Sequence, residues 1–306
     1  MTTLDASLLQ QAAASAAGLQ SHPPGALYVV ATPIGNLADM TLRAIHVLGL
    51  ADAIACEDTR HSAPLLRQLG IEGKALLAVH EHNERDAAAG VLARLARGER
   101  VAYVSDAGTP AVSDPGAVLV AAAQAAGYRC VPIPGVSSAV AALSVAGDAV
   151  VGPFTFVGFL SSRAGERTRG VQQLAANPQA QVLFEAPHRI EALALALAEG
   201  CGARLVTVCR ELTKQFESVS TMPAAALPAW LAADAHRSRG EFVLVVHALV
   251  AVTEESDTPS FDSTLRTLLA ALPLKQAVAL TAELTGAPRN ALYERALALK
   301  NAAESA

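Results

Sequence analysis

The strongest constraint on the fold is an alternation, along residues 26–147, of short apolar runs with segments of helical character. The apolar runs lie at 26–32, 52–58, 75–80, 100–104 and 129–133. They are continuous rather than alternately polar, as expected of parallel strands that helices cover on both faces. The high hydrophobic content of 52%, much of it alanine, suits helices packed on sheets. Strands that alternate with helices predict an α/β fold with a doubly wound, mostly parallel sheet.

A second group of strands and helices begins near residues 152–153. Strands are predicted at 154–160, 181–185, 204–209, 216–221 and 241–247. The third and fourth of these are too close in sequence for a crossover helix, so they should pair antiparallel. The second domain is therefore expected to contain a mixed sheet.

The remaining segments complete the predicted domain organisation. A flexible leader is expected over 1–24, an N-terminal α/β domain over 25–147, a C-terminal α/β domain over 148–250 and a polar linker over 251–260. Residues 261–306 form a helical tail, with helices predicted at about 261–271, 274–285 and 289–299. This spacing resembles a helix-turn-helix, and a helical cap or dimerisation piece is the alternative interpretation.

Composition excludes several classes of protein. The net charge of −5 argues against a nucleic-acid binder with a uniformly basic surface, although a local basic patch is compatible with it. None of the four cysteines is at C-x-x-C spacing, which argues against a zinc site and suits a reducing compartment. The leader does not have the pattern of a signal peptide, and no apolar run reaches the roughly 20 residues of a membrane span. We therefore expect a soluble, cytoplasmic protein with no metal site.

Polar or glycine-containing clusters follow four strands of the first domain. They are Pro-Ile-Gly at 33–35, Glu-Asp-Thr-Arg at 57–60, Ser-Asp-Ala-Gly-Thr-Pro at 105–110 and Pro-Gly-Val-Ser-Ser at 134–138. Parallel strands end at one edge of a sheet, which is where open α/β sheets bind ligands. The second domain repeats the pattern at 185–189, 210–214 and 240–241. The simplest geometry is a cleft lined by strand ends from both domains.

The turn at 105–110 illustrates the two interpretations of each cluster. Asp106 places a carboxylate at the end of the strand, Gly108 permits close approach of a ligand, and Thr109 adds a hydroxyl. The alternative is an ordinary turn, followed by a helix that Ser113 or Asp114 caps. Familiar signatures are absent from the sequence, because it has no G-x-G-x-x-G in its first turn, no Walker A motif, no H-E-x-x-H and no G-x-S-x-G.

Seven motifs occur in an order that is similar to one known family. They are TPIGNL (32–37), CEDTR (56–60), YVSDAGTPAVSDPG (103–116), PIPGVSSAVAAL (132–143), FEAPHR (184–189), CRELTKQFE (209–217) and GEFVLVV (240–246). Together they resemble the ribosomal RNA small subunit methyltransferase I family, a branch of the tetrapyrrole methylase superfamily. The tail segments LPLKQAVALTAELTG (272–286) and RNALYERAL (289–297) look like that family's C-terminal helix-turn-helix piece.

The resemblance implies an activity and a set of binding residues. The family transfers a methyl group from S-adenosylmethionine to the 2′-hydroxyl of a cytidine in small-subunit rRNA near the decoding site. It has a two-domain fold with the cofactor in the cleft, and it is usually a homodimer. By the family's pattern the cofactor-binding residues are Ile34, Asp106, Thr109, Val136, Ser137, Phe184, Leu212 and Gly240.

Catalytic and RNA-binding roles are hypotheses built on these motifs. Glu57 and Asp58 end a buried strand, where carboxylates are uncommon unless they are paired or functional. Either could accept the proton of the ribose hydroxyl, and Glu185 is the alternative. Arg60, His188, Arg189 and Lys214 are expected at the RNA, and the residues expected to border the cleft are Arg163, Arg167, Arg169, Arg189 and Lys214. The rival functions are methylation of a small tetrapyrrole and a non-catalytic role in ribosome assembly.

Overall fold

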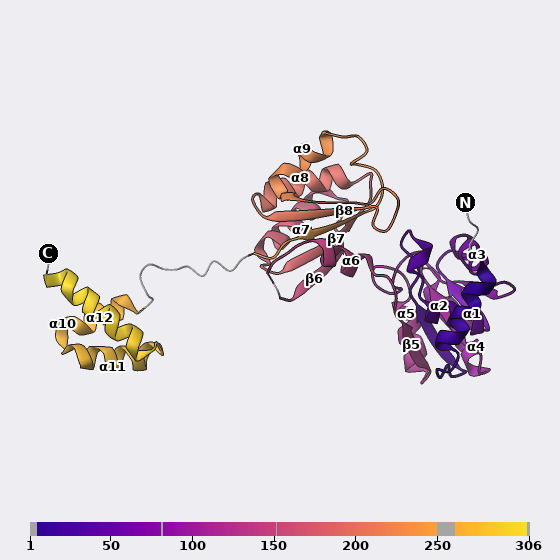
Figure 1. Cartoon of the computed structure of the whole chain (residues 1–306), viewed down its shortest axis with the longest axis horizontal. Coiled ribbons are helices and arrows are strands. Elements are labelled where there is room, and N and C mark those ends of the chain that lie inside the picture. The colour runs from indigo at the N-terminus through magenta and orange to yellow at the C-terminus, as the bar shows by residue number, and fades with distance from the viewer. Residues whose placement is uncertain (1–4, 81, 151, 250–260, 305–306) are drawn as a thin grey trace. The chain divides into compact units, whose positions relative to one another are not determined.

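The computed structural model describes residues 5–80, 82–150, 152–249 and 261–304 (Figure 1). Contacts divide the chain into two compact units, Met1–Leu249 and Val250–Ala306, each with hydrophobic clusters of its own. The expected linker over 251–260 lies outside the described residues. No helix within the described ranges is both long and apolar enough to span a bilayer.

The first sheet has five parallel strands in the order β3-β2-β4-β1-β5. They are β1 (Ala26–Val30), β2 (Ala53–Cys56), β3 (Ala75–Ala78), β4 (Val101–Val104) and β5 (Arg129–Ile133). The intervening helices are α2 (Leu42–Leu50), α3 (Thr59–Gln68), α4 (Glu84–Ala96), α5 (Ala117–Ala125) and α6 (Ser138–Val145), with a short η1 (Leu37–Asp39). Every residue of β2 and β4 is buried, which confirms the parallel sheet predicted from continuous apolar runs.

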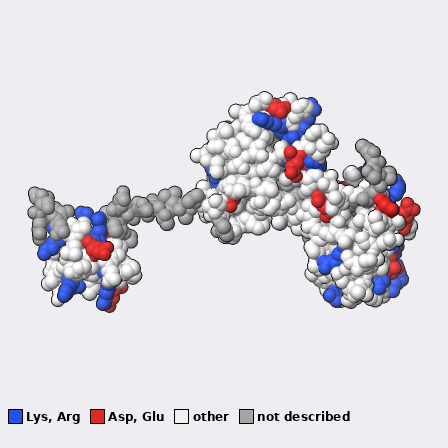
Figure 2. Space-filling model, viewed as in Figure 1, with Lys and Arg blue, Asp and Glu red and all other residues white. Residues whose placement is uncertain are grey.

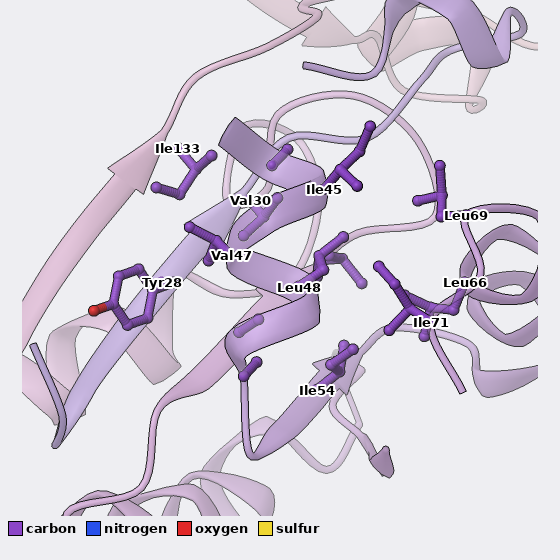
Figure 3. Packing of buried hydrophobic residues seen from close by; sticks show 14 of the residues in the cluster. Tyr28, Val30, Ile45, Val47, Leu48, Ile54, Leu66, Leu69, Ile71 and Ile133 are labelled. Atoms are coloured by element: carbon purple, nitrogen blue, oxygen red, sulfur yellow. The ribbon is translucent and has the colours of Figure 1, made fainter. Parts of the chain in front are cut away.

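Helix α2 shows how the sequence builds one face of this sheet. Thr41 caps the helix, since its hydroxyl accepts a hydrogen bond from the backbone N–H of Ala44 at 3.1 Å. Ile45 and Leu48 then lie on one side of the helix and pack in the cluster that contains Tyr28 of β1 (Figure 3). Each fully buried side chain of this size stabilises the fold by about 1.5–3 kcal/mol. A separate cluster that includes residues of α4 and α5 packs on Tyr103 of β4, so helices cover both faces.

The second sheet is mixed, with the order β6-β7-β10-β8-β9. Its strands are β6 (Phe154–Phe159), β7 (Ala180–Glu185), β8 (Leu205–Arg210), β9 (Ser218–Pro223) and β10 (Phe242–Val246). Only β6 and β7 pair parallel, and β8 and β9 form the antiparallel pair that the short connection predicted. The associated helices are α7 (Ala164–Ala176), α8 (Ile190–Cys201), η2 (Ala224–Ala226) and α9 (Leu227–Ala232).

The N-terminal segment differs from the flexible leader expected over 1–24. From Asp5 onward, the first residue described, the chain forms α1 (Ala6–Ala17), and Asp5 caps it by accepting from the N–H groups of Ser7 and Leu8. Buried alanines pack the helix against α2. The Gln10 amide also donates to the carbonyls of Leu69 and Gly70. Small side chains allow this close approach, so the alanine-rich composition indicates a docked helix. The boundary near residue 147 between two α/β domains stays a prediction.

The second unit contains the three predicted helices, α10 (Asp262–Ala271), α11 (Leu274–Thr285) and α12 (Arg289–Glu304). Gly286 ends α11 in the left-handed conformation, with φ of 73°. The core is small and centres on Leu265 and Leu292. The carboxylate of Asp262 accepts two hydrogen bonds from the guanidinium of Arg295, at 2.6 and 2.9 Å, and so joins α10 to α12.

Candidate functional site

Strand ends from both sheets line one hollow of about 300 Å³. From the first sheet it receives Ile34, Ala107 and Ser138, each in or beside a turn that follows a strand. The second sheet contributes most of the rest: Phe159, Phe184, Glu185, Ala186, Pro187, Cys209, Leu212, Glu241, Phe242 and Val243. This main hollow therefore combines a largely apolar, partly aromatic lining with two carboxylates.

The first-sheet turns at this hollow are tied together by the backbone. Thr32 and Gly108 exchange N–H to carbonyl hydrogen bonds of 2.9 and 3.1 Å. The Thr109 hydroxyl donates to the carbonyl of Val136 at 2.9 Å. Gly108 has φ of 81°, a conformation that glycine adopts without strain. The turns after β1, β4 and β5 thus form one connected rim.

The second sheet contributes a strained loop to the same hollow. Glu211 and Thr213 have positive φ values of 53° and 66°, which costs about 1–3 kcal/mol each for residues with a side chain. The Glu211 carboxylate holds the loop by accepting from the Glu241 N–H at 2.8 Å and from the Lys214 ammonium at 2.9 Å. Leu212, between the two strained residues, is directed into the buried wall of the hollow.

Lys214 also meets the first turn of the chain. A Cβ added to Gly35 would lie 2.3 Å from Cγ of Lys214, so any larger residue there would force the Lys214 side chain to move. The ammonium group of Lys214 pairs with both Glu211 and Glu241, at 2.9 and 2.8 Å. Its charge is therefore largely neutralised within the protein, although the sequence suggested a role at RNA.

Glu185, at the end of β7, is the most deeply buried acid of the main hollow. Its side chain is 0% exposed, and Oε1 lies 2.9 Å from Nε of Arg189 and accepts from the Ala186 N–H at 2.9 Å. The other oxygen, Oε2, is buried and has no hydrogen-bond partner. Arg189 Nη2 donates to the carbonyl of Leu160, so its guanidinium is anchored inward, but its Nε is buried with no hydrogen-bond partner and its contact with Glu185 is an ion pair. The neighbouring His188 is exposed.

A second hollow, of about 330 Å³, is lined by Glu57, Asp58, Thr59, Arg60, Ala78, His80 and Asp106. Asp58 caps α3 by accepting from the Arg60 N–H at 2.8 Å, and it also binds the Arg60 guanidinium at 2.6 Å. Hydrogen bonds from the Arg60 side chain and then from its backbone lower the pKa of Asp58 to about 2. Asp106 lines this hollow while its neighbour Ala107 lines the main one, so the turn after β4 contributes to both.

Both carboxylate oxygens of Asp106 contact other groups of the protein. Its Oδ1 accepts from the backbone N–H of Asp58 at 3.2 Å, and its Oδ2 lies 3.0 Å from Nδ1 of His61. These contacts join the turns after β2 and β4, which the parallel sheet places side by side.

Two acids, Asp114 and Glu84, have surroundings that reasoning from the sequence did not predict. Burial and, secondly, the neighbouring Glu57 raise the pKa of Asp114 to about 6. The expectation that Ser113 or Asp114 caps the next helix was wrong, because α5 begins only after Gly116. The buried Glu84 carboxylate caps that helix instead, accepting from the N–H groups of Gly116 and Leu119 at 2.8 and 3.0 Å. A cap so far back along the chain leaves no local sequence signal.

Known protein families match most of the chain. The family model of the tetrapyrrole (corrin/porphyrin) methylases matches residues 26–228, and that of the RsmI C-terminal HTH domain matches residues 255–300. The ribosomal RNA small subunit methyltransferase I of Pseudomonas aeruginosa is 46% identical, with 89% of this chain and 97% of that protein covered. The protein of the same name from Neisseria meningitidis serogroup A is 45% identical, with 96% of this chain and 98% of that protein covered. The one from Escherichia coli O157:H7 is 44% identical, with 89% of this chain and 95% of that protein covered. The chain belongs to the ribosomal RNA small subunit methyltransferase I family.

Solved structures agree on the fold of this family member. Uroporphyrin-III C-methyltransferase from Thermus thermophilus has a TM-score of 0.51 at 22% identity, with 73% of this chain and 94% of that chain covered. The methyltransferase CobJ has a TM-score of 0.56 at 21% identity, with the same coverage. These similarities show a shared two-sheet fold.

The residues that the family pattern suggested for the cofactor divide into two sets. Ile34, Phe184 and Leu212 line the main hollow. The lining found in the structure does not include Asp106, Thr109, Val136, Ser137 or Gly240, but chain neighbours of several of them, Ala107, Ser138 and Glu241, are part of it. Their roles at the cofactor stay predictions.

The expected basic border of the cleft is not part of the wall of the main hollow, as far as the structure describes it. Arg189 and Lys214 reach it only through ion pairs with the lining acids Glu185 and Glu241. Arg163 pairs with Glu166 at 3.0 Å on α7. On the face shown in Figure 2, basic and acidic side chains are interspersed in small groups. The gathering of Arg163, Arg167 and Arg169 at the cleft therefore stays a prediction.

Proposed function

We propose that this protein transfers a methyl group from S-adenosylmethionine to the 2′-hydroxyl of a cytidine in small-subunit rRNA, near the decoding site. The observation that carries this proposal is the main hollow at the strand ends of both sheets, in a chain 44–46% identical over most of its length to proteins named ribosomal RNA small subunit methyltransferase I. We further propose that it acts as a homodimer in the cytoplasm, on rRNA or the ribosomal subunit.

The main hollow has the properties of a site for the methyl donor. Its volume of about 300 Å³ is at the lower end of the range for small-molecule sites. Ile34, Phe184 and Leu212 offer apolar surface for the adenosine portion. When bound, S-adenosylmethionine supplies an electrophilic methyl carbon on a sulfonium. A solved uroporphyrin-III C-methyltransferase with this fold carries S-adenosyl homocysteine, the demethylated product.

The acceptor oxygen must be held in line with that carbon, and its proton needs an acceptor. A carboxylate whose pKa is about 2 takes up a proton poorly at neutral pH, which argues against Asp58 as the base. Glu57 lines the second hollow, and its Oε2 accepts from the backbone N–H of Asp106 at 3.5 Å, in the turn after β4 that also reaches the main hollow through Ala107. We therefore assign the proton acceptor to Glu57. Asp58 holds the exposed Arg60 guanidinium where it can meet an RNA phosphate.

The test uses small ribosomal subunits from cells that lack the protein, incubated with isotopically labelled S-adenosylmethionine. Digestion and mass spectrometry should find one 2′-O-methylcytidine. The Glu57→Gln variant should lower kcat by about 100-fold without changing affinity for the methyl donor, because it removes only the proton acceptor. Glu72→Gln, an exposed acid of the same domain, is the matched control. Label found in a porphyrinoid offered in parallel, and none in the rRNA, would favour the tetrapyrrole alternative.

A further inference from the structure

One aromatic residue at the main hollow is left largely uncovered by the protein. Phe159 ends β6 and lines the hollow, yet it is 53% exposed. Other large apolar residues of the same wall are much better covered, since Leu212 and Phe242 are only 9% and 2% exposed. Single exposed apolar residues are common on protein surfaces, so it is the position of Phe159 at the hollow that makes its exposure informative.

A shift in strand pairing sets the direction of the Phe159 ring. The register between β6 and β7 shifts between Phe156 and Gly158, as in a β-bulge, and Phe159 pairs with Phe184 beyond the shift. In a regular strand, residues 156 and 159 would face opposite sides of the sheet. Here both rings contact the Phe184 ring edge to face, with centroid distances of 5.0 and 5.7 Å. Bulges beside active sites commonly redirect a side chain in this way.

The ring therefore lies on the side of the sheet that carries the hollow, and its surroundings hold it there. Phe184 packs against the buried cluster that contains Leu212, and both residues line the hollow. The glycine before Phe159 has φ of 70°, and a Cβ added to it would lie 3.0 Å from Oγ of Ser113. Ser113 follows the turn at 105–110, which contributes to both hollows. The end of β6 thus meets the loop of the first sheet beside the exposed ring.

We propose that the Phe159 ring stacks on the nucleobase of the nucleotide that receives the methyl group. This role rests on the proposed use of rRNA as the methyl acceptor. The 2′-hydroxyl must approach the methyl carbon in line, and the base is attached to the ribose carbon next to the one that bears this hydroxyl. The base of the acceptor nucleotide therefore comes to the mouth of the hollow, where Phe159 is exposed. Stacking on aromatic side chains is a general way in which proteins bind unpaired bases of RNA.

Exposure separates this role from binding of the methyl donor. Phe184 and Leu212 face inward and suit the adenosine portion, whereas Phe159 is open to solvent on the side from which a macromolecular acceptor must arrive. Every base has a flat π face, so stacking of this kind is tolerant of sequence. Phe159 accordingly supplies affinity and orientation of the nucleotide, and the choice of cytidine depends on other contacts.

The test compares two leucine substitutions on one strand. Phe159→Leu keeps an apolar side chain but removes the ring, and it should lower kcat/KM for small ribosomal subunits, at saturating S-adenosylmethionine, by about 5- to 150-fold. Phe159→Tyr keeps a ring and should recover most of this loss. Phe154→Leu is the matched control, because Phe154 is 48% exposed at the other end of β6 and lies outside the described wall of the hollow. It should methylate like the unaltered protein.

Two binding measurements show whether the loss has another origin. Calorimetry with S-adenosylhomocysteine should give the same affinity for Phe159→Leu as for the unaltered protein, and a weakened affinity would place the ring at the methyl donor and overturn the proposal. Light scattering should give the same molecular mass, and a changed mass would place Phe159 in a contact between two copies of the chain, which also overturns it. Thermal unfolding checks that each variant is folded.

The remaining outcomes separate this proposal from the proposed function. Equal kcat/KM values for Phe159→Leu and Phe154→Leu, while the unaltered protein methylates small subunits, would overturn the stacking role and leave the proposed function intact. If the unaltered protein methylates no small subunit, the proposed function itself fails and the stacking role fails with it.

Discussion

Replacing Asp114 by asparagine should stabilise this protein at neutral pH. The carboxyl of Asp114 is half-buried near Glu57 and Asp106, and burial followed by these acids raises its pKa from 3.8 to about 6. Between those two values the folded state holds a proton that the unfolded chain has released. The free energy of unfolding therefore falls as the pH rises through this window, and above pH 6 the full penalty is present. Asparagine cannot ionise, so the variant escapes the penalty.

The size of the effect follows from the two pKa values. The two values differ by about two pKa units, and each unit corresponds to about 1.4 kcal/mol. The ionised Asp114 therefore lowers the free energy of unfolding by at most about 3 kcal/mol. Solvent screens a half-exposed carboxyl, so we expect about 1 kcal/mol above pH 7. For a unit of this size that gain corresponds to a rise in Tm of about 2–4 °C. Near pH 4 the two proteins should unfold at nearly the same temperature.

Thermal unfolding of Asp114→Asn and of the unaltered protein should be followed by far-UV circular dichroism from pH 4 to pH 8. Tryptophan fluorescence is less suitable, because the single tryptophan, Trp230, lies in α9 beside the second sheet, whereas Asp114 lies beside the first. The exposed Asp86→Asn on α4 is the matched control, and its Tm difference should be small at every pH. A Tm difference for Asp114→Asn that does not change with pH, or one that reverses sign at pH 8, would refute the electrostatic reasoning.

Two further predictions concern stability. In Gly116→Ala the new Cβ would lie 2.2 Å from the Tyr103 ring at a φ of 122°, so the variant should lose about 2–5 kcal/mol in denaturant unfolding. Gly90→Ala, in open space on α4, should instead gain about 0.5–1 kcal/mol, and equal losses in the two variants would contradict the steric argument. Arg295→Met leaves Asp262, whose side chain is only 5% exposed, without its main partner and should cost about 2–3 kcal/mol. Hydrogen exchange of the full chain should then show lost protection in α10–α12 alone, and a loss spread into the first sheet would disagree with two separate units.

The class of each sheet followed from short-range patterns in the sequence. Continuous apolar runs such as 53–56 and 101–104 can only be buried on both faces, which predicts a parallel sheet with helices on both sides. The short connection between β8 and β9 similarly required an antiparallel pair. Strand order β3-β2-β4-β1-β5 could not be predicted in this way, because it depends on packing between segments far apart in the chain.

The convergence of strand ends at one hollow was predictable, but the partners of the side chains there were not. Strand-end clusters were expected to converge, and Ile34, Phe184 and Leu212 do line one hollow. The Asp58 carboxylate, however, accepts hydrogen bonds from the Arg60 guanidinium and from the Arg60 backbone N–H at the start of α3. Arg189 is likewise bound to Glu185. Such pairs depend on side-chain rotamers and local backbone geometry, which residue type and spacing do not specify.

The strained loop in the wall of the main hollow is held in place by contacts within the protein. Glu211 and Thr213 hold conformations that cost about 1–3 kcal/mol each, and the Glu211 carboxylate offsets that cost by binding Glu241 N–H and the Lys214 ammonium. The same Lys214 packs against Gly35 of the first turn, so the strained loop is also fixed to the opposite rim. A wall held in this way is formed before any ligand arrives. The loss of conformational entropy on ordering the loop then occurs during folding and not during binding. More of the free energy of the ligand contacts therefore contributes to the affinity for the methyl donor.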